Sequence, residues 1–363
     1  MKTEADTAVY ALTQQGAMTA AKIASVMQVD LYLPPFVEPD CPVPGTVHFN
    51  SLRALVAESF SAYRRHIFIT AAGVAVRCIA PHLSDKRIDP AIVVLDHHGR
   101  NVVSLLSGHL GGANALAHEV ADILDGQAVI TTATDTERLP SLDILALESN
   151  LVIANVKAVA KINSALLAGR PVILDDLHNH LKLKGSAWKD LFIFAGSEAH
   201  NALCPEEAED MVRVTVTPGI GVPSERNLIL HPKVLHVGIG CRRGIKSKEI
   251  IDYITTTLTQ LGLATGSIAS IASAEVKQFE PGLHEAAAEL GVPLKFFSVK
   301  DLDAVQVTNV SPKAQEVFGL DGVCEPAAVL AAGQNGILRL PKRAGRGITI
   351  AVVQEMLDTA SHA

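Results

Sequence analysis

The sequence contains few aromatic side chains: they make up only 4% of the 363 residues, although apolar residues make up 48%. A core with so few large rings must be built mainly from Ala, Val, Ile and Leu. This composition is typical of parallel β-sheets that helices cover on both faces. We therefore expect an α/β protein, and the length predicts two or three domains of about 100–200 residues each.

The sequence also lacks an excess of positive charge, since its formal net charge is -7. A broad surface that follows nucleic-acid phosphates needs the opposite sign, so we expect no nucleic-acid partner. A local basic patch for a small polyanion remains open. The five cysteines form no CxxC pair. This favours a reducing compartment over a disulfide framework, and we expect a cytoplasmic protein.

Long apolar runs are missing as well. No stretch approaches the roughly 18 apolar residues of a membrane-spanning helix, and the amino terminus MKTEADTAVYAL carries acids ahead of a short apolar run. We expect neither a signal peptide nor a membrane anchor. The pairs His97–His98 and His178/His180 lack a third ligand at metal spacing, so we expect no metal site.

Short runs rich in β-branched residues alternate with helix-like segments along the chain. Examples are HIFIT (66–70), AIVVLD (91–96) and AVITT (128–132), and such alternation is typical of doubly wound sheets. The pattern weakens after Asp135 and resumes at VLHVGIG (234–240), beyond the Pro/Gly-rich connector PGIGVPSERN (218–227). We predict two open, mostly parallel α/β domains, residues 1–139 and 231–363, joined through a middle α/β segment, residues 140–230.

The stretch SLLSGHLGGANALA (104–117) places three glycines, a histidine and an asparagine between a strand and a helix. Ala113, Leu116 and Val120 share one helical stripe, so the helix should begin near Gly111. Free N–H groups and the positive end of the helix dipole would then converge on the loop, which predicts a site for a carboxylate or phosphate. The candidate contacts are Ser107, Gly108, Gly111, Gly112 and Asn114. The alternative is a tight structural turn in which His109 only caps the helix.

Two other strand ends have a similar form. ITTATD (130–135) puts Thr131, Thr132 and Asp135 at the end of a strand, where open α/β sheets bind ligands. ITAAGVAVRCIAP (69–81) puts Gly73 after a strand and Arg77 one turn later. All five residues are candidate substrate contacts. The alternatives are that Asp135 is a helix N-cap and Arg77 a solvated charge.

The segment GIGCRRG (238–244) also lies between a strand and a helix, but it matches neither nucleotide fingerprint. Its last glycine, Gly244, comes four residues after Gly240 instead of three, and Ile245 follows where a P-loop has lysine. What remains is a glycine turn with two adjacent guanidinium groups, which suit planar carboxylates. The candidate contacts in this segment are Gly238, Gly240, Cys241, Arg242 and Arg243.

Two carboxylates near expected helix starts are candidate acid/base groups. KQFEPGL (277–283) contains Glu280 three residues after Lys277. Lys277 is a further candidate substrate contact. VCEPAAVLAAG (323–333) contains Glu325 near its start. The alternative role of both carboxylates is compensation of a helix dipole.

Several of these segments together resemble one protein family. DPAIVVLDHHGRNVVSLLSGHLGGANALA with ITTATD downstream, then HVGIGCRRG, KQFEPGL and VCEPAAV in this order, resemble the CbiG family, the cobalt-precorrin-5A hydrolases of anaerobic cobalamin (vitamin B12) biosynthesis. The resemblance covers residues 67–135 and 234–353. It implies a hydrolase that opens a lactone on a cobalt-corrinoid intermediate and releases acetaldehyde. It also implies that the substrate carries the cobalt, that no organic cofactor is needed, and that other enzymes of the pathway hand over the substrate.

The resemblance does not identify the general base, so His109, Glu280 and Glu325 are candidates in that order. His109 comes first because imidazole titrates near neutral pH, and we expect the helix mouth to favour its neutral form. Arg242 and Arg243 are expected to hold substrate carboxylates. Two other functions remain open: a non-catalytic corrinoid carrier, and a nucleotide-dependent oxidoreductase, which the two failed fingerprints weaken.

Overall fold

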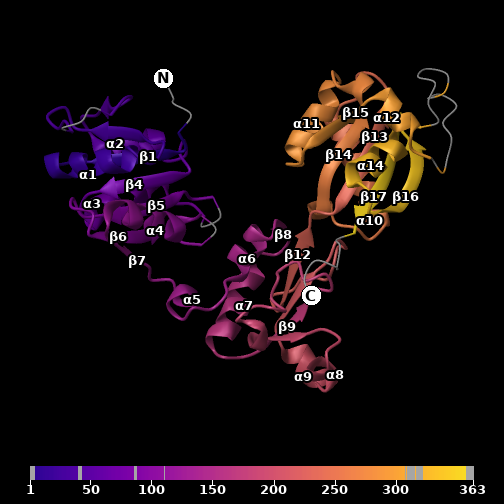
Figure 1. Cartoon of the computed structure of the whole chain (residues 1–363), viewed down its shortest axis with the longest axis horizontal. Helices are drawn as coiled ribbons and strands as arrows, with labels where there is room; N and C mark the ends of the chain where they lie inside the picture. Colours follow the sequence, from indigo (N-terminus) through magenta and orange to yellow (C-terminus); the bar gives the residue numbers. More distant parts are fainter. Residues whose placement is uncertain are drawn as a thin grey trace. The chain divides into compact units, whose positions relative to one another are not determined.

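The computed structural model describes residues 5–39, 43–85, 88–109, 111–306, 308, 315 and 322–356. The chain divides into two compact units, residues 1–144 (unit 1) and residues 145–363 (unit 2). Figure 1 shows strands and helices alternating along the chain in both units. No helix in the described ranges is both long and apolar enough to cross a membrane.

Unit 1 is built on a seven-stranded sheet with the strand order β3-β2-β1-β4-β5-β6-β7. The strands are β1 (Thr7–Ala11), β2 (Asp30–Leu33), β3 (Val47–His48), β4 (Arg65–Ile69), β5 (Ala91–Leu95), β6 (Asn101–Leu106) and β7 (Gln127–Val129). β1 to β5 pair in parallel. β6 is antiparallel to β5, and β7 is parallel to β6. The strand order reverses between β1 and β4. β2 and β3 follow on one side of β1, and the chain then returns to place β4 on the other side.

Helices cover both faces of this sheet. α1 (Gln14–Ala24) and α4 (Ala113–Leu124) pack on one face. α2 (Leu52–Ser59) and α3 (Ala72–Ile79) pack on the other. Because both faces are covered, every residue of β1 and β5 is buried, and their sequences read as continuous apolar runs. The short elements are η1 (Ala80–His82), α5 (Ala133–Thr136) and α6 (Leu142–Glu148), which crosses into unit 2.

Unit 2 contains two five-stranded sheets, and the first has the order β10-β9-β11-β12-β8. Its strands are β8 (Leu151–Ile153), β9 (Val172–Asp175), β10 (Phe192–Phe194), β11 (Arg213–Val216) and β12 (Asn227–Pro232). Its helices are α7 (Lys157–Leu167), η2 (Lys189–Leu191), α8 (Glu198–Asn201) and α9 (Pro205–Asp210). β12 is a buried strand that the sequence pattern did not predict, since NLILHP follows directly on the connector.

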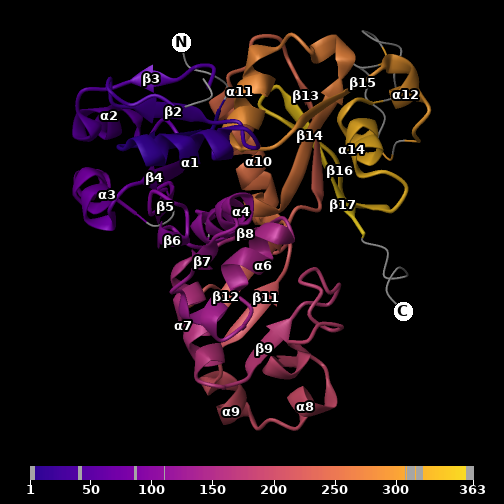
Figure 2. The same ribbon diagram turned by 60° about the vertical axis from the view of Figure 1, so that its left-hand side comes forward.

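The second sheet of unit 2 has the order β15-β14-β13-β17-β16. Its strands are β13 (Leu235–Cys241), β14 (Ile268–Ala274), β15 (Leu294–Phe297), β16 (Gly336–Gly345) and β17 (Ile348–Glu355). Its helices are α10 (Ser247–Gln260), η3 (Thr265–Ser267), η4 (Glu275–Lys277), α11 (Pro281–Glu289), α12 (Val299–Asp303) and α14 (Cys324–Ala332). Figure 2 shows α10 and α11 on one face and α12 and α14 on the other. β13, β14 and β15 are parallel, so the expected α/β class with mostly parallel sheets is confirmed.

A buried histidine lies in the core of unit 1. His66 on β4 has no exposed surface. Its Nε2 atom is 3.1 Å from the carbonyl of Phe60, and its Nδ1 atom is 3.0 Å from the hydroxyl of Tyr10. The carbonyl can only accept, so Nε2 donates, and the neutral ring then accepts the Tyr10 proton at Nδ1. Burial lowers the pKa of His66 to about 4, because a charged ring would lose its hydration.

We predict that unit 1 loses stability as the pH falls from about 6.5 to 4. In that range the unfolded chain binds a proton at His66 that the folded protein excludes, so acid favours unfolding, by about 3 kcal/mol over the whole window. Hydrogen-exchange protection of β4 and β5 amides measures the effect. The His66→Gln variant should lose this part of the pH dependence, and an equal pH dependence in both proteins would contradict the assignment.

Candidate active site

The antiparallel β6 brings two distant segments of unit 1 together. Because β6 is antiparallel to β5, the loop that follows β6 leaves the sheet at the edge where the parallel strands begin. There Ser107 Oγ donates a 3.0 Å hydrogen bond to the carbonyl of Asp89, which lies just before β5. β7 runs parallel to β6, so the segment at 130–135 leaves at the same edge. His109 and Asp135 therefore meet, although 26 residues separate them.

The imidazole of His109 lies between two carboxylates. Its Nε2 atom is 2.9 Å from Asp135 Oδ2 and 3.1 Å from Thr134 Oγ1. Its Nδ1 atom is 3.1 Å from Ser141 Oγ and 3.6 Å from Asp143 Oδ2. The Ser141 hydroxyl donates to Asp143, so its oxygen accepts from Nδ1–H. Both ring nitrogens then act as donors, which is the arrangement of a protonated imidazolium.

The carboxylates decide the charge of the ring. The nearby Asp143 carboxylate raises the pKa of His109 above its usual value, and Asp135 adds to the effect against the opposing influence of burial. Burial would raise the pKa of the Asp143 carboxyl, but the nearby His109 ring and the hydrogen bond from Ser141 outweigh it, and the pKa is lowered. We expected the helix mouth to favour the neutral ring, whereas the two neighbouring carboxylates shift the pKa of His109 in the opposite direction.

The helix mouth itself is closed by its own loop. The N–H of Ala113 donates to the carbonyl of Ser107 at 3.1 Å, and the N–H of Asn114 donates to the carbonyl of Gly108 at 3.0 Å. These are the backbone donors that we expected to bind an anion. The structure uses them internally, so the proposed carboxylate or phosphate site at this helix start is not supported.

The glycines of the loop have steric reasons of their own. A Cβ atom on Gly108 would lie 2.6 Å from Asn114 Oδ1, and one on Gly111 would lie 2.3 Å from Ser107 Cβ. Gly112 has a φ of 86°, a left-handed conformation that glycine adopts without strain. The loop therefore needs glycine in order to fold tightly, as in the alternative interpretation of the sequence.

Asn114 ties three segments around His109. Its Oδ1 accepts from Ser104 on β6 at 2.7 Å, and its Nδ2 lies 3.1 Å from both Thr132 Oγ1 and Asp135 Oδ2. It holds Asp135 in place and is itself buried. Thr131, the remaining candidate of this segment, is exposed.

Asp135 is the accessible end of the chain Asp135–His109–Asp143. Its side chain is 35% exposed, compared with 16% for His109 and 10% for Asp143. Oδ2 of Asp135 accepts two hydrogen bonds, while Oδ1 has no hydrogen-bond partner among the described residues. A water molecule or a ligand can therefore reach this carboxylate.

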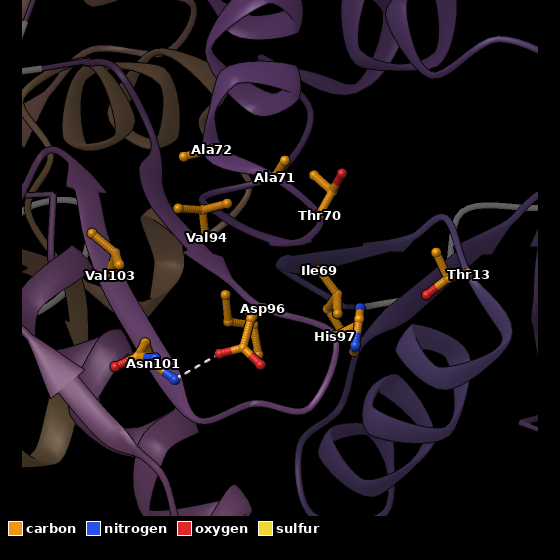
Figure 3. A pocket seen from close by; sticks show the side chains of 11 residues that line it. Thr13, Ile69, Thr70, Ala71, Ala72, Val94, Asp96, His97, Asn101 and Val103 are labelled. Atoms are coloured by element: carbon orange, nitrogen blue, oxygen red, sulfur yellow. Dashed lines mark hydrogen bonds between the residues drawn. The ribbon is translucent and has the colours of Figure 1, made fainter.

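Gly73 and Arg77 lie at the opposite edge of the same sheet, after the carboxyl end of β4. Arg77 donates a 2.9 Å hydrogen bond to the carbonyl of Gly73 within α3. Beside them is a pocket of about 440 Å³ at the reversal of strand order between β1 and β4 (Figure 3). Its walls include Thr13, Thr70, Ala71, Ala72, Val94, Asp96, His97, Asn101 and Val103. The structure thus separates Gly73 and Arg77 from His109.

The candidates of unit 2 gather where β13 and β14 end. Cys241 ends β13, and the N–H of Gly244 donates to Glu280 Oε2 at 3.1 Å. Lys277 Nζ lies 3.3 Å from Glu280 Oε1. The hydrogen bond from Gly244 lowers the pKa of Glu280, and Lys277 adds to this effect. Glu280 is thus a fixed anion that joins two loops, which disfavours a role as general base.

Glu325 also serves the backbone. Its side chain is buried, Oε1 accepts from the N–H of Thr308 at 2.5 Å, and Oε2 accepts from the N–H of Lys342 at 3.0 Å. Two of the glycines nearby make room for α14 and β17. A Cβ atom on Gly238 would lie 1.7 Å from the carbonyl oxygen of Cys324, and one on Gly240 would lie 2.5 Å from Thr349 Oγ1.

Sequence reasoning missed Ser141 and Asp143, which complete the surroundings of His109. The segment LPSLD offered one weak signal, an acid at a helix start, and nothing in the spacing linked it to His109. Within the described ranges no three His, Cys, Asp or Glu side chains come together as metal ligands.

Comparison with known proteins places the chain among proteins of cobalamin biosynthesis. Family models match at residues 54–135 (Cobalamin synthesis G N-terminal), 140–232 (Cobalamin biosynthesis central region) and 235–353 (Cobalamin synthesis G C-terminus). The second of these covers the middle segment, where we saw no resemblance in the sequence.

Two curated relatives match almost the whole chain. The cobalt-precorrin-5A hydrolase of Priestia megaterium is 30% identical over 357 residues, which cover 96% of this chain and 94% of the relative. That of Salmonella typhimurium is 31% identical over 337 residues, which cover 90% and 92%. A solved structure, a cobalamin biosynthesis protein G homolog from Sulfolobus solfataricus, is 23% identical, with coverage of 96% and 97% and a TM-score of 0.37.

We predict that Asp143→Asn lowers the pKa of His109. The neutral amide removes the larger of the two carboxylate effects, so the ring should lose its proton at a lower pH. NMR titration of isotope-labelled histidine side chains measures this pKa. Asp135→Asn should lower it as well. An unchanged pKa in Asp143→Asn would show that the described contact does not govern the ring.

We also predict that Gly238→Ala destabilises unit 2 strongly. The new methyl group would overlap the Cys324 carbonyl, and relieving such an overlap costs about 3 kcal/mol or more. Urea unfolding followed by circular dichroism measures the loss. Gly185→Ala is the matched control, since a Cβ atom there meets nothing within 4 Å. Equal stability of the two variants would exclude a steric role for Gly238.

Proposed function

The chain belongs to the CbiG family, and we propose that it is a cobalt-precorrin-5A hydrolase that opens the lactone of its substrate and releases acetaldehyde. Two relatives at 30% and 31% identity, matched over nearly their whole length, are cobalt-precorrin-5A hydrolases. The protein is an enzyme, and its substrate is a cobalt-corrinoid intermediate of cobalamin biosynthesis. The release of acetaldehyde is our proposal for the second part of the reaction.

The chemistry needs one proton acceptor and one proton donor. In the first step the oxygen of water bonds to the lactone carbonyl carbon, and the ring-opening oxygen leaves as a hydroxyl group. In the second step this hydroxyl loses its proton and becomes the aldehyde C=O. The carbon–carbon bond to the macrocycle breaks, its electron pair stays on the macrocycle, and that carbon takes up a proton. One water is consumed and no electrons are gained or lost.

One observation in unit 1 supports this assignment most: His109 Nε2 lies 2.9 Å from the accessible carboxylate of Asp135, and the neighbouring carboxylates raise the pKa of the ring. We propose that Asp135 accepts the proton of the water, passes it to the departing ring oxygen, and then accepts the proton of the resulting hydroxyl group. His109 supplies the proton that the macrocycle needs. The short hydrogen bond between them lets the proton return, so the pair is regenerated in each cycle. Asp143 positions the ring and does not meet the substrate.

The remaining features of the proposal concern binding and setting. Arg242, Arg243 and Lys277 are proposed to bind the acidic arms of the macrocycle in unit 2, since guanidinium groups form strong paired hydrogen bonds with carboxylates. No organic cofactor is proposed, because the balanced reaction calls for no redox step or group carrier. Cobalt enters as part of the substrate. We further propose a cytoplasmic setting and hand-over of the substrate from other enzymes of the pathway.

We predict that the purified protein converts cobalt-precorrin-5A with release of one acetaldehyde per substrate, without added nicotinamide, flavin or nucleotide. Acetaldehyde is measured with a coupled dehydrogenase added after quenching. His109→Ala should lower turnover by about 10²–10⁴-fold, the usual contribution of acid–base catalysis. Ser25→Ala, on the far end of α1, is a control that should leave turnover unchanged.

Other outcomes of this experiment favour the alternative functions. Binding with a spectral change but no acetaldehyde would indicate a corrinoid carrier. Release that begins only after nicotinamide is added would indicate an oxidoreductase. Full turnover in His109→Ala would leave the hydrolase intact and remove His109 from the reaction.

A further inference from the structure

Two loops of unit 2 form one continuous surface at the carboxyl ends of β13 and β14. The first is the basic loop, residues 242–248, and the second is the aromatic loop, residues 275–280. The N–H of Gly244 donates to Glu280, and a Cβ atom on Gly282 would lie 2.1 Å from the carbonyl oxygen of Ile245. The loops are therefore packed against each other. Parallel α/β sheets bind their ligands at this edge.

The basic loop concentrates positive charge in a protein of net charge -7. Its seven residues include Arg242, Arg243, Lys246 and Lys248 and no acid. The Arg242 side chain is 64% exposed, and its distance of 4.0 Å from Glu249 is at the long limit for an ion pair. Such exposed pairs contribute little to stability. The guanidinium groups are therefore available to a ligand that carries carboxylates.

The aromatic loop, which packs against the basic loop, exposes two apolar side chains. Phe279 is 85% exposed and Val276 is 49% exposed. Backbone hydrogen bonds hold the chain on both sides of Phe279. The N–H of Gln278 donates to the carbonyl of Glu275, and the N–H of Glu280 donates to the carbonyl of Lys277. An exposed phenylalanine forgoes the burial energy that a core position would give it. An exposed ring on a hydrogen-bonded turn, one residue before the Glu280 that binds the basic loop, has the properties of a contact surface.

We propose that Phe279 packs against the apolar face of the corrinoid macrocycle while Arg242 and Arg243 bind its peripheral carboxylates. This inference rests on the proposed function, because it takes the substrate from there. Such a ligand combines a flat, apolar centre with an acidic rim, and the two packed loops expose an aromatic ring and two guanidinium groups. Aromatic rings stack on flat conjugated systems with favourable contact over their whole face.

The binding test uses a cobalt corrinoid whose peripheral arms are free carboxylic acids, titrated by absorbance into the full-length protein. Phe279→Ala should weaken binding at least tenfold, because the flat contact is lost. Phe279→Tyr should bind as tightly as the wild type, since the aromatic ring remains. Phe36→Ala is the matched control: this residue is 82% exposed in unit 1, far from both loops in the sequence, and its loss should change nothing. Equal affinities of Phe279→Ala and Phe36→Ala would overturn the proposal.

A second ligand separates the two parts of the surface. When all arms of the same corrinoid are methyl-esterified, its affinity should still fall in Phe279→Ala. The wild type and the Arg242→Ala, Arg243→Ala double variant should then bind it with equal affinity. If a single-stranded oligonucleotide binds with the same dependence on Phe279 and the corrinoid does not, the surface serves nucleic acid and the proposal is wrong.

Acetaldehyde release keeps this inference separate from the proposed function. If the wild type releases acetaldehyde, and Phe279→Ala binds the corrinoid and reacts normally at limiting substrate, the proposed function stands. Only the proposed contact of Phe279 is then wrong. A wild-type protein that binds the corrinoid through Phe279 without releasing acetaldehyde retains the surface, and the hydrolase assignment fails.

Discussion

The antiparallel pairing of β5 with β6 decides where the chemistry of unit 1 is placed. In a wholly parallel sheet the loops after β4 and β6 would leave at the same edge, and Gly73, Arg77 and His109 would be neighbours. The reversal sends the His109 loop to the opposite edge, and β7, parallel to β6, brings Asp135 to the same place. One change of strand direction therefore separates the pocket beside β4 from the histidine and gives that histidine its carboxylates.

Internal hydrogen bonding explains most of the glycine-rich loops without a ligand. The loop after β6 satisfies the first amides of α4 with its own carbonyls, and its glycines permit that tight path. In unit 2, Gly238 makes room for the backbone of α14. Glu280 and Glu325 follow the same principle, because both carboxylates accept backbone N–H groups: Glu280 that of Gly244, and Glu325 those of Thr308 and of Lys342 in β16. What remains for a ligand is the small set of polar groups that these bonds leave over.

Electrostatics distinguishes the two candidate sites. Around His109 two carboxylates face one ring and raise its pKa, while Oδ1 of the outer carboxylate, Asp135, has no hydrogen-bond partner among the described residues. At the ends of β13 and β14 the sign is reversed, since acids are paired with Lys277 and backbone amides while the guanidiniums stay exposed. The first arrangement suits proton transfer and the second suits binding of an acidic molecule.

The sequence by itself determined the α/β class, most strands and helices, and the family, because apolar periodicity and ordered motifs are local properties of the chain. It also identified His109, Asp135 and the Arg242–Arg243 turn as residues of interest. It did not determine the charge of His109, the roles of Ser141 and Asp143, or the separation of Gly73 from the histidine loop. Each of these depends on which strands pair and in which direction. Only the tertiary structure decides that, because the pKa of a side chain follows from neighbours that strand pairing brings close, whatever their distance in sequence.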